Sequence, residues 1–341
     1  MKKLYFIALL FICLASNART VNLKIVETSD VHGAFFPNMG KVYAYVEEQR
    51  KVYGDNLLLL DAGDILQGEP CSYFYNFVNI DEENVAAKVV NYMRYDAQTF
   101  GNHDVETGHA VYDKWGKEVK CPTLGANIIE KNTGKPYAIP YYIYKRKGVK
   151  VAVLGMLTPA IPNWLSEKLW SGLEFEDIKA SCKKWIEIIK KKEKPDVIIG
   201  LFHSGLKGGI TTDTYCENEA EQVAREVPGF DAIMFGHDHQ KYCQKITNIE
   251  GNDVWMLNPA NKAHRVAELT VSIEGKKKTL QGSLHETDSY EPSAEYMAYF
   301  ADDIKKIDNY MEEPIGVFDD DMATHDAFFG NSKYIDFIHK F

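Results

Sequence analysis

The chain has 341 residues, of which 45% are hydrophobic and 26% are charged, a composition typical of soluble globular proteins. This length leaves room for one large domain or two ordinary ones with an ample core. The formal net charge of −10 argues against duplex or long single-stranded nucleic acid as a partner, because an acidic surface repels polyanions. A small phosphorylated substrate is compatible with this charge, since bound divalent metal ions reverse the local sign.

The first 18 residues differ from the rest of the chain. Two lysines precede an apolar run over residues 4–15, and small residues follow up to Ala18. This pattern predicts a secretory signal peptide over residues 1–18, too short to be a stable membrane anchor. A buried N-terminal strand and a lipoprotein signal at Cys13 are weaker alternatives. Loss of both lysines changes the charge from −10 to −12, and we expect an exported protein, periplasmic or secreted, without an integral membrane segment after cleavage.

Five cysteines remain after this segment, an odd number without a CxxC pair, at Cys71, Cys121, Cys182, Cys216 and Cys243. The spacing therefore does not indicate a disulfide framework. One or two bridges would be compatible with an oxidising compartment, and the sequence leaves their pairing open.

Along the mature chain, short apolar runs alternate with segments whose apolar residues recur every three or four positions. The runs predict strands over residues 23–28, 56–60, 97–100, 149–155, 196–202, 232–235, 254–257 and 267–273. The other segments predict helices over residues 42–52, 82–95, 178–192 and 217–226. This alternation favours an α/β core with partly parallel strands. Stricter alternation near 141–144 and 267–273 suggests antiparallel additions.

The pattern changes late in the chain. Residues 286–292 are polar and rich in turn formers, and 294–311 show the spacing of a charged amphipathic helix. We therefore expect a main domain over residues 19–290, a linker helix over 291–313, and the beginning of a second domain, incomplete here, over 314–341.

Five short motifs carry potential metal ligands, each placed where an apolar run ends. They are Asp30-Val31-His32, Gly63-Asp64, Gly101-Asn102-His103-Asp104, His203 and Gly236-His237-Asp238-His239. Open α/β folds build their sites where strand ends meet at one edge of a sheet. Nitrogen and oxygen donors without a thiolate favour zinc, manganese or iron rather than a cysteine-rich structural zinc. Unrelated polar residues are the alternative, and five motifs in this order make it weak.

Two divalent ions about 3.5–4 Å apart require a shared carboxylate that offsets their repulsion. Asp64, in a short turn after an apolar run, is the best candidate for this bridge. Asp30 and His32 lie two residues apart on an extended segment and can bind one ion together. The remaining ligands are Asn102, His203 and His237 for the other ion, and His239 for the first.

This order of motifs resembles the calcineurin-like metallophosphoesterases. Within that superfamily the chain resembles the secreted 5′-nucleotidase group, which includes the 2′,3′-cyclic-nucleotide 2′-phosphodiesterase/3′-nucleotidases, over residues 21–341. The resemblance implies an α/β metallophosphoesterase β-sandwich of two mixed sheets flanked by helices. It also implies two sets of metal ligands: Asp30, His32, Asp64 and His239 for one ion, and Asp64, Asn102, His203 and His237 for the other.

Stretches outside the metal motifs favour the cyclic-phosphodiesterase branch, at residues 64–70, 159–164, 203–206 and 226–237. We therefore expect a hydrolase of nucleotide phosphoesters, most consistent with a 2′,3′-cyclic-nucleotide 2′-phosphodiesterase/3′-nucleotidase. The first alternative is a 5′-nucleotidase or nucleotide-sugar hydrolase with the same metals, and thiosulfonate cleavage is a weaker one. A catalytically silent metal-binding surface module is the alternative of another class.

The expected chemistry is attack by a metal-held hydroxide on phosphorus, because two cations neutralise the phosphoryl oxygens and lower the pKa of bound water. His103 adjoins the predicted ligand Asn102 and can assist the leaving group. Glu106 and Asp104 are its candidate carboxylate partners. In the 5′-nucleotidases the partner lies three residues after this histidine and is Asp, whereas here that residue is Glu106.

Substrate-binding residues are not identifiable in this sequence. The resemblance implies that they lie mainly in a C-terminal nucleotidase domain, of which residues 314–341 would be the beginning. We expect a small nucleotide or phosphoester as the partner, and the sequence carries no indication of oligomeric state.

Overall fold

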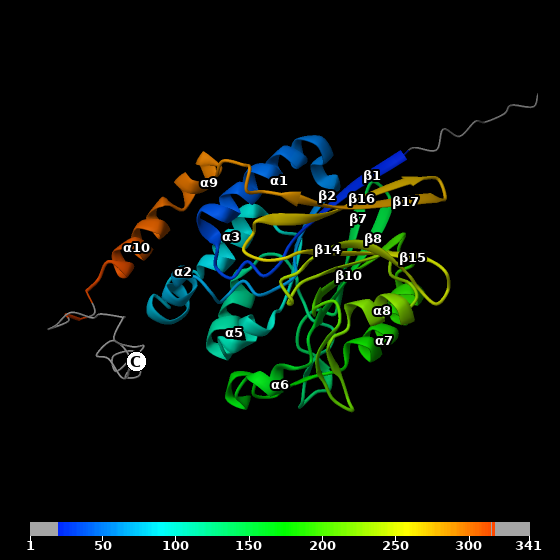
Figure 1. Cartoon of the computed structure of the whole chain (residues 1–341), viewed down its shortest axis with the longest axis horizontal. Helices are drawn as coiled ribbons and strands as arrows, with labels where there is room; N and C mark the ends of the chain where they lie inside the picture. The colour runs from blue at the N-terminus through cyan, green and yellow to red at the C-terminus, as the bar shows by residue number, and fades with distance from the viewer. Residues whose placement is uncertain (1–19, 315, 318–341) are drawn as a thin grey trace, which may run out of the picture. The chain divides into compact units, whose positions relative to one another are not determined.

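Two six-stranded sheets form the centre of the fold (Figure 1). The computed structural model describes residues 20–314, 316 and 317. The predicted signal peptide lies outside the described residues, as does nearly all of the predicted second domain. The first sheet has the order β17 (Lys277–Glu286), β16 (Arg265–Glu274), β1 (Thr20–Thr28), β2 (Leu57–Asp61), β3 (Ala97–Thr99) and β4 (Thr123–Leu124).

The second sheet has the order β14 (Lys241–Thr247), β15 (Asp253–Pro259), β13 (Ala232–Phe235), β10 (Val197–His203), β8 (Val149–Leu157) and β7 (Tyr141–Arg146). Both sheets are mixed: β1 and β2 are parallel while β1 and β16 are antiparallel, and β8 is parallel to β10 but antiparallel to β7. Smaller sheets are β6 (Lys135–Pro136), β5 (Ile128–Glu130) and β9 (Leu173–Phe175), and the hairpin of β11 (Gly208–Thr211) and β12 (Cys216–Asn218).

Alternating side chains pack the two sheets together. Leu23 and Ile25 of β1 point into an apolar layer that also contains Val151 of β8 and Ile199 of β10, all fully buried. Successive strand residues point to opposite faces, so each sheet also has an outer apolar face that needs a cover. On the second sheet that cover is α7 (Ile178–Lys192) and α8 (Ala220–Glu226), and α1 (Gly40–Tyr53) packs on the first (Figure 1).

The other helices are α2 (Pro70–Tyr73), α3 (Val85–Met93), α4 (Asn102–Glu106), α5 (His109–Glu118), α6 (Ile161–Trp164), α9 (Ala294–Tyr299) and α10 (Ala301–Met311). Short π or 3-10 segments are η1 (Phe35–Met39), η2 (Gly54–Asn56), η3 (Phe74–Val78) and η4 (Glu167–Leu169). No helix in the described part of the chain is long and apolar enough to cross a membrane. The five cysteines after the predicted signal peptide are all unbridged.

The predicted two-sheet sandwich flanked by helices is confirmed, and so are its antiparallel additions β7 and β16. The helix predicted over 178–192 has those bounds in the structure, because the Asp177 side chain caps its first turn by accepting the amide N–H of Ala180. Strands β14 and β17 were not predicted. Both carry several exposed side chains, so their apolar signal is weak.

Three predicted helices differ clearly from the structure in their bounds, and the one predicted over 82–95 spans only Val85–Met93. The helix predicted over 217–226 begins only at Ala220, because Cys216–Asn218 pair as β12 with β11. The single linker helix is two helices, α9 and α10, interrupted at Phe300. The described residues up to Ala301 belong to one compact unit, and those from Asp302 onward belong to another.

Helix α9 belongs to the first unit because its apolar side chains pack on that unit. Tyr296 is fully buried, with ring centroids 5.7 Å from Tyr43 and 4.7 Å from Phe300. Tyr299 on the same helix is 57% exposed. Tyr299 does stack on Tyr92, with centroids 4.2 Å apart, but Tyr296 is the ring that α9 buries fully.

We expect Tyr296→Ala to lower the free energy of unfolding by about 3–5 kcal/mol, because it removes a large buried ring and leaves a cavity. The matched control Tyr299→Ala should cost less than about 1.5 kcal/mol, since most of that side chain is exposed. Urea unfolding of both variants would measure the difference, and equal losses would contradict this account of α9.

Candidate metal centre

The predicted ligands come together from loops of both sheets. Asp30, Asp64 and Asn102 follow β1, β2 and β3 of the first sheet, while His203 ends β10 and His237 follows β13 of the second. Strands β1, β2 and β3 are parallel neighbours, and so are β10 and β13. Their carboxyl ends therefore lie together within each sheet. The sequence predicted one edge of a sheet, whereas the structure uses matching edges of two sheets packed face to face.

One group of potential ligands consists of Asp30, His32 and His239, with one donor atom of each within 4.8 Å of the others. The Nε2 atoms of His32 and His239 lie 3.1 Å apart. The Nε2 atom of His239 lies 3.3 Å from Oδ1 of Asp30. On its other side, the His239 ring contacts the Asn261 amide through Nδ1 at 3.0 Å. These are the residues predicted to hold the first ion, without Asp64.

A second group consists of Asp30, Asp64 and His203. The Nε2 atom of His203 lies 3.2 Å from Oδ2 of Asp64 and 3.0 Å from Oδ1 of Asn102. The same Asp64 oxygen lies 3.8 Å from Nε2 of His32. Asp30 belongs to both groups, and Asp64 lies beside a histidine of each, so both carboxylates are placed where a bridging ligand is needed.

Among the predicted histidine and carboxylate ligands, His237 is the one outside both groups. Its ring lies beside that of His203, with centroids 5.1 Å apart, and its backbone N–H donates to Asp30 at 3.0 Å. Its Nε2 atom, however, lies 3.0 Å from Oε1 of Glu217. Sequence reasoning missed Glu217 because it assigned this residue to a helix. A carboxylate on one ring nitrogen is the usual partner of a metal-binding histidine.

Backbone strain is concentrated at the predicted ligands. Positive φ angles occur at Asp30 (51°), His32 (48°), Asp64 (59°), His237 (82°) and His239 (56°). Such a conformation costs about 1–3 kcal/mol at a non-glycine residue and persists where the surroundings enforce it, commonly at functional sites. Here backbone hydrogen bonds enforce it, since the amide of Asp30 donates to Gly63 and that of His32 donates to Asp64, both at 2.9 Å.

The buried carboxylates of Asp30 and Asp64 make the centre a favourable place for positive charge. Burial alone would raise the pKa of Asp64, but the adjacent imidazole of His203 holds that pKa well below its usual range. Burial would likewise lower the pKa of His203, yet the carboxylates of Asp64 and Asp30 raise it to about 10. Asp30, Asp64 and His203 are at most 1% exposed. Buried oxygen and nitrogen donors with this excess of negative charge fit divalent cations.

His103 lies at the rim of this centre. It follows Asn102 directly on α4, and the centroid of its ring is 5.4 Å from that of the His32 ring. Its Nδ1 atom lies 2.5 Å from Oε2 of Glu106. The side chains of His103 and Glu106 are 38% and 42% exposed, so both are accessible from solvent.

Asp104, the other carboxylate considered as a partner of His103, has a different position. It is fully buried, and its two oxygens accept the backbone N–H groups of four residues: Asp64, Ile65, Leu66 and Gly101. These bonds hold the loop after β2 against the start of α4. We therefore correct the catalytic assignment of Asp104 to a structural one, because its acceptor positions are directed at the backbone.

Three glycines in the motifs are required by close packing around the carboxylates. A Cβ atom on Gly101 would lie 2.0 Å from Oδ1 of Asp64, and one on Gly236 would lie 2.4 Å from Oδ2 of Asp30. A Cβ atom on Gly63 would lie 2.6 Å from the backbone nitrogen of Gly101. Each glycine thus lets a backbone segment approach the centre where any side chain would displace it.

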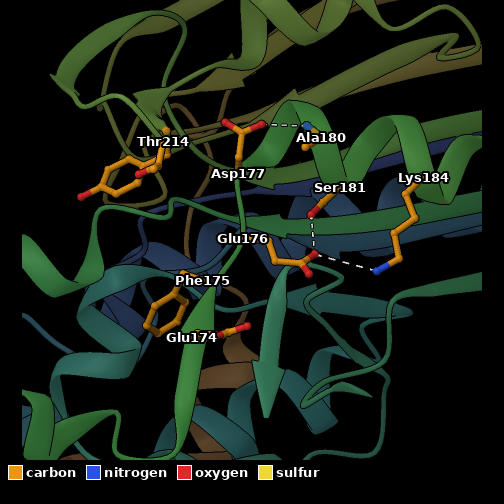
Figure 2. Close-up of a pocket in the computed structure, with 9 residues that line it drawn as sticks. Glu174, Phe175, Glu176, Asp177, Ala180, Ser181, Lys184 and Thr214 are labelled. Carbon is orange, nitrogen blue, oxygen red and sulfur yellow. Dashed lines mark hydrogen bonds and ion pairs between the residues drawn. The ribbon is translucent and has the colours of Figure 1, made fainter. Parts of the chain in front are cut away.

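A separate pocket lies beside the first turn of α7 and includes Thr214 at the tip of the β11–β12 hairpin (Figure 2). None of the predicted site residues lines it. Its polar side chains serve local structure, since Asp177 caps α7 and Glu176 accepts the Ser181 hydroxyl at 2.9 Å. We therefore do not assign this pocket to the metal centre.

We expect Gly101→Ala to weaken divalent-metal affinity by roughly 10- to 100-fold, because the added methyl group must displace Asp64. The control is Gly116→Ala inside α5, where nothing lies within 4 Å of the new Cβ atom. That change should leave metal binding intact and raise stability by about 0.5–1 kcal/mol. Calorimetric titration with Mn²⁺ or Zn²⁺ would test this, and wild-type affinity in Gly101→Ala would refute it.

Comparison with known proteins agrees with this geometry. The family model described as calcineurin-like phosphoesterase matches residues 23–241. A 5′-nucleotidase of Vibrio cholerae is 31% identical over 242 residues, covering 68% of this chain and 42% of that protein. A 2′,3′-cyclic-nucleotide 2′-phosphodiesterase/3′-nucleotidase of Yersinia enterocolitica is 28% identical over 266 residues, covering 70% and 40%. The chain thus spans about two fifths of the length of these relatives.

Among solved structures, the calcineurin-like phosphoesterase YfkN from Bacillus subtilis has the same fold. Its TM-score is 0.75 at 23% sequence identity, covering 86% of this chain and 100% of that chain. At this identity the likeness concerns the fold alone, whereas the family model spans more than half of the chain and includes the predicted ligands from Asp30 to His239. This chain belongs to the calcineurin-like phosphoesterase family.

Proposed function

We propose that this chain is a dinuclear-metal hydrolase of nucleotide phosphoesters, with 2′,3′-cyclic-nucleotide 2′-phosphodiesterase/3′-nucleotidase as its activity. The observation that carries the proposal is a pair of ligand groups that share Asp30, with Asp64 beside a histidine of each and the His103–Glu106 pair at their rim. The cofactors would be two divalent ions, zinc, manganese or iron, which suit imidazole, carboxylate and amide donors.

Asp30, His32, Asp64 and His239 would hold one ion, and Asp64, Asn102, His203 and His237 the other. Such ions neutralise the phosphoryl oxygens and lower the pKa of bound water when they are present. The protein contributes the rigid positions of the ligands. His203, for example, is fixed from behind by the carbonyl of Ala62, 2.7 Å from its Nδ1 atom.

His103 would protonate the leaving sugar oxygen. Its contact with Glu106 occupies Nδ1, which leaves Nε2 as the nitrogen that can serve the substrate. A carboxylate at this position orients the ring for proton transfer, as a general acid requires. The partial exposure of both side chains leaves space for a substrate in front of them.

The choice of substrate rests on sequence features and relatives. The stretches 64–70, 159–164, 203–206 and 226–237 favour the cyclic-phosphodiesterase branch, and one such enzyme is among the relatives. A relative named 5′-nucleotidase supports the alternative, a 5′-nucleotidase or nucleotide-sugar hydrolase. A silent metal-binding module is disfavoured because five potential ligands gather in two adjoining groups, with Asn102 against His203 and the His103–Glu106 pair at the rim.

Domain organisation and export are part of the proposal. The main domain would carry the metal centre, and residues 314–341 would begin a C-terminal domain that contributes most of the substrate contacts. The segment 1–18 would direct the protein to the periplasm or the exterior. We further propose that small nucleotides or phosphoesters, rather than nucleic-acid polymers, are the substrates, in line with the net charge of −10.

Product analysis with 2′,3′-cyclic AMP, 3′-AMP and 5′-AMP would test the substrate assignment on protein loaded with Mn²⁺ or Zn²⁺. We expect adenosine from 3′-AMP and 3′-AMP as the intermediate from the cyclic ester. Turnover of 5′-AMP alone would favour the 5′-nucleotidase alternative. Absence of turnover for these esters, p-nitrophenyl phosphate and its bis ester with several metals would favour the silent module.

His103→Ala should reduce turnover by about 10²–10⁴-fold while metal content stays unchanged, because the change removes a proton donor and no ligand. Glu106→Gln should reduce turnover less, since it keeps the ring but weakens its orientation. The control is His109→Ala on α5, another histidine beside a carboxylate, 3.3 Å from Asp113 but outside the centre. It should keep wild-type turnover. Loss of metal from His103→Ala, measured by elemental analysis, would make His103 a ligand instead.

A further inference from the structure

Trp164 is an exposed indole at the edge of the metal centre. It closes the one-turn helix α6, in the loop that follows β8 of the second sheet. Its side chain is 39% exposed, in contrast to Trp115, which is fully buried in the core. A large exposed aromatic side chain next to a polar centre is a feature that packing of the core does not explain.

The turn that carries Trp164 is held in place by its neighbours. Ile161 is fully buried and anchors the turn, while the amide of Leu165 donates to the carbonyl of Ile161 at 3.0 Å. The hydroxyl group of Tyr215 donates to the side-chain oxygen of Asn163 and joins this turn to the β11–β12 hairpin. Because Ile161 and Asn163 secure the turn, the indole is not needed as its anchor.

The indole lies one side chain away from the metal ligands. Its ring centroid is 5.6 Å from that of His237, with the two planes inclined by 41°. The ring of His237 in turn lies 5.1 Å from that of His203. Glu217 of the hairpin contacts Nε2 of the same His237 ring at 3.0 Å. Trp164 thus places an apolar ring beside three polar side chains, those of His237, His203 and Glu217.

We propose that Trp164 is a binding surface for the organic group of the substrate, the aryl or nucleoside group esterified to the phosphate. This inference deepens the proposed function and depends on it, because it assumes that the phosphoryl group binds at the metal centre. A planar ring on such a group can stack on the exposed indole, and stacking of this kind tolerates any flat ring. Trp164 would therefore determine which organic groups bind tightly, and it would not take part in breaking the phosphoester bond.

Two ligands that resist hydrolysis separate this role from the chemistry. Phenylphosphonate and methylphosphonate share the phosphoryl oxygens and differ in the ring, so their affinity ratio measures contact with the organic group. We would titrate both by calorimetry into the full chain saturated with Mn²⁺. The wild type should bind phenylphosphonate more tightly than methylphosphonate, and Trp164→Ala should weaken phenylphosphonate by roughly tenfold while leaving methylphosphonate unchanged.

Trp164→Phe provides the conservative control, since it keeps a stacking ring and should recover most of the phenylphosphonate affinity. Metal content and melting temperature of both variants would show that the centre and the fold are intact. Equal weakening of both ligands by Trp164→Ala, or loss of metal, would overturn the proposal and make Trp164 a support for His237. Equal affinity of the wild type for both ligands would overturn it as well.

The outcomes also separate this inference from the proposed function. If the metal-loaded wild type binds neither phosphonate, the phosphoester site fails and the inference fails with it. If it binds both and hydrolyses nucleotides, but Trp164→Ala leaves the affinity ratio unchanged, the inference alone is wrong.

Discussion

The buried carboxylates of Asp30 and Asp64 are the constraint on which the rest of the centre depends. Both are at most 1% exposed, and an ionised carboxylate removed from water costs several kcal/mol unless positive charge lies beside it. The imidazoles of His203 and His239 lie 3.2 and 3.3 Å from these carboxylates. A pair of divalent cations would satisfy the same requirement more fully, and this need for charge explains why histidines, an amide and carboxylates gather at one place.

The geometry around these carboxylates depends on backbone conformations that ordinary residues avoid. Five predicted ligands have positive φ angles, and three motif glycines leave no room for a side chain. Asp104 adds four backbone hydrogen bonds that fix the loop of Asp64 against α4. The two packed sheets supply the rigid frame that maintains this strain, since the loops begin at strand ends buried in a common core.

Local patterns predicted which motifs come together, although His237 lies outside both ligand groups, and they predicted the surroundings less well. The ligand motifs follow strands whose apolar runs are visible in the sequence, as in β10 before His203. Glu217 was hidden because residues 217–226 have helical spacing, whereas the pairing of β12 with β11 overrides that local preference. The position of Trp164 had no local signal, because its proximity to His237 joins residues 73 positions apart through the fold.

The sequence by itself determined the kind of fold and the donor types that gather at the centre, because strand periodicity and the residue types after each strand are local properties. It also offered Glu106 as one of two partners for His103. The tertiary structure alone decided between Glu106 and Asp104, placed Asp30 in both ligand groups with Asp64 beside them, and brought Glu217 to His237. Those outcomes depend on how two sheets pack and where their loops meet, and such long-range contacts leave no period or spacing in the chain.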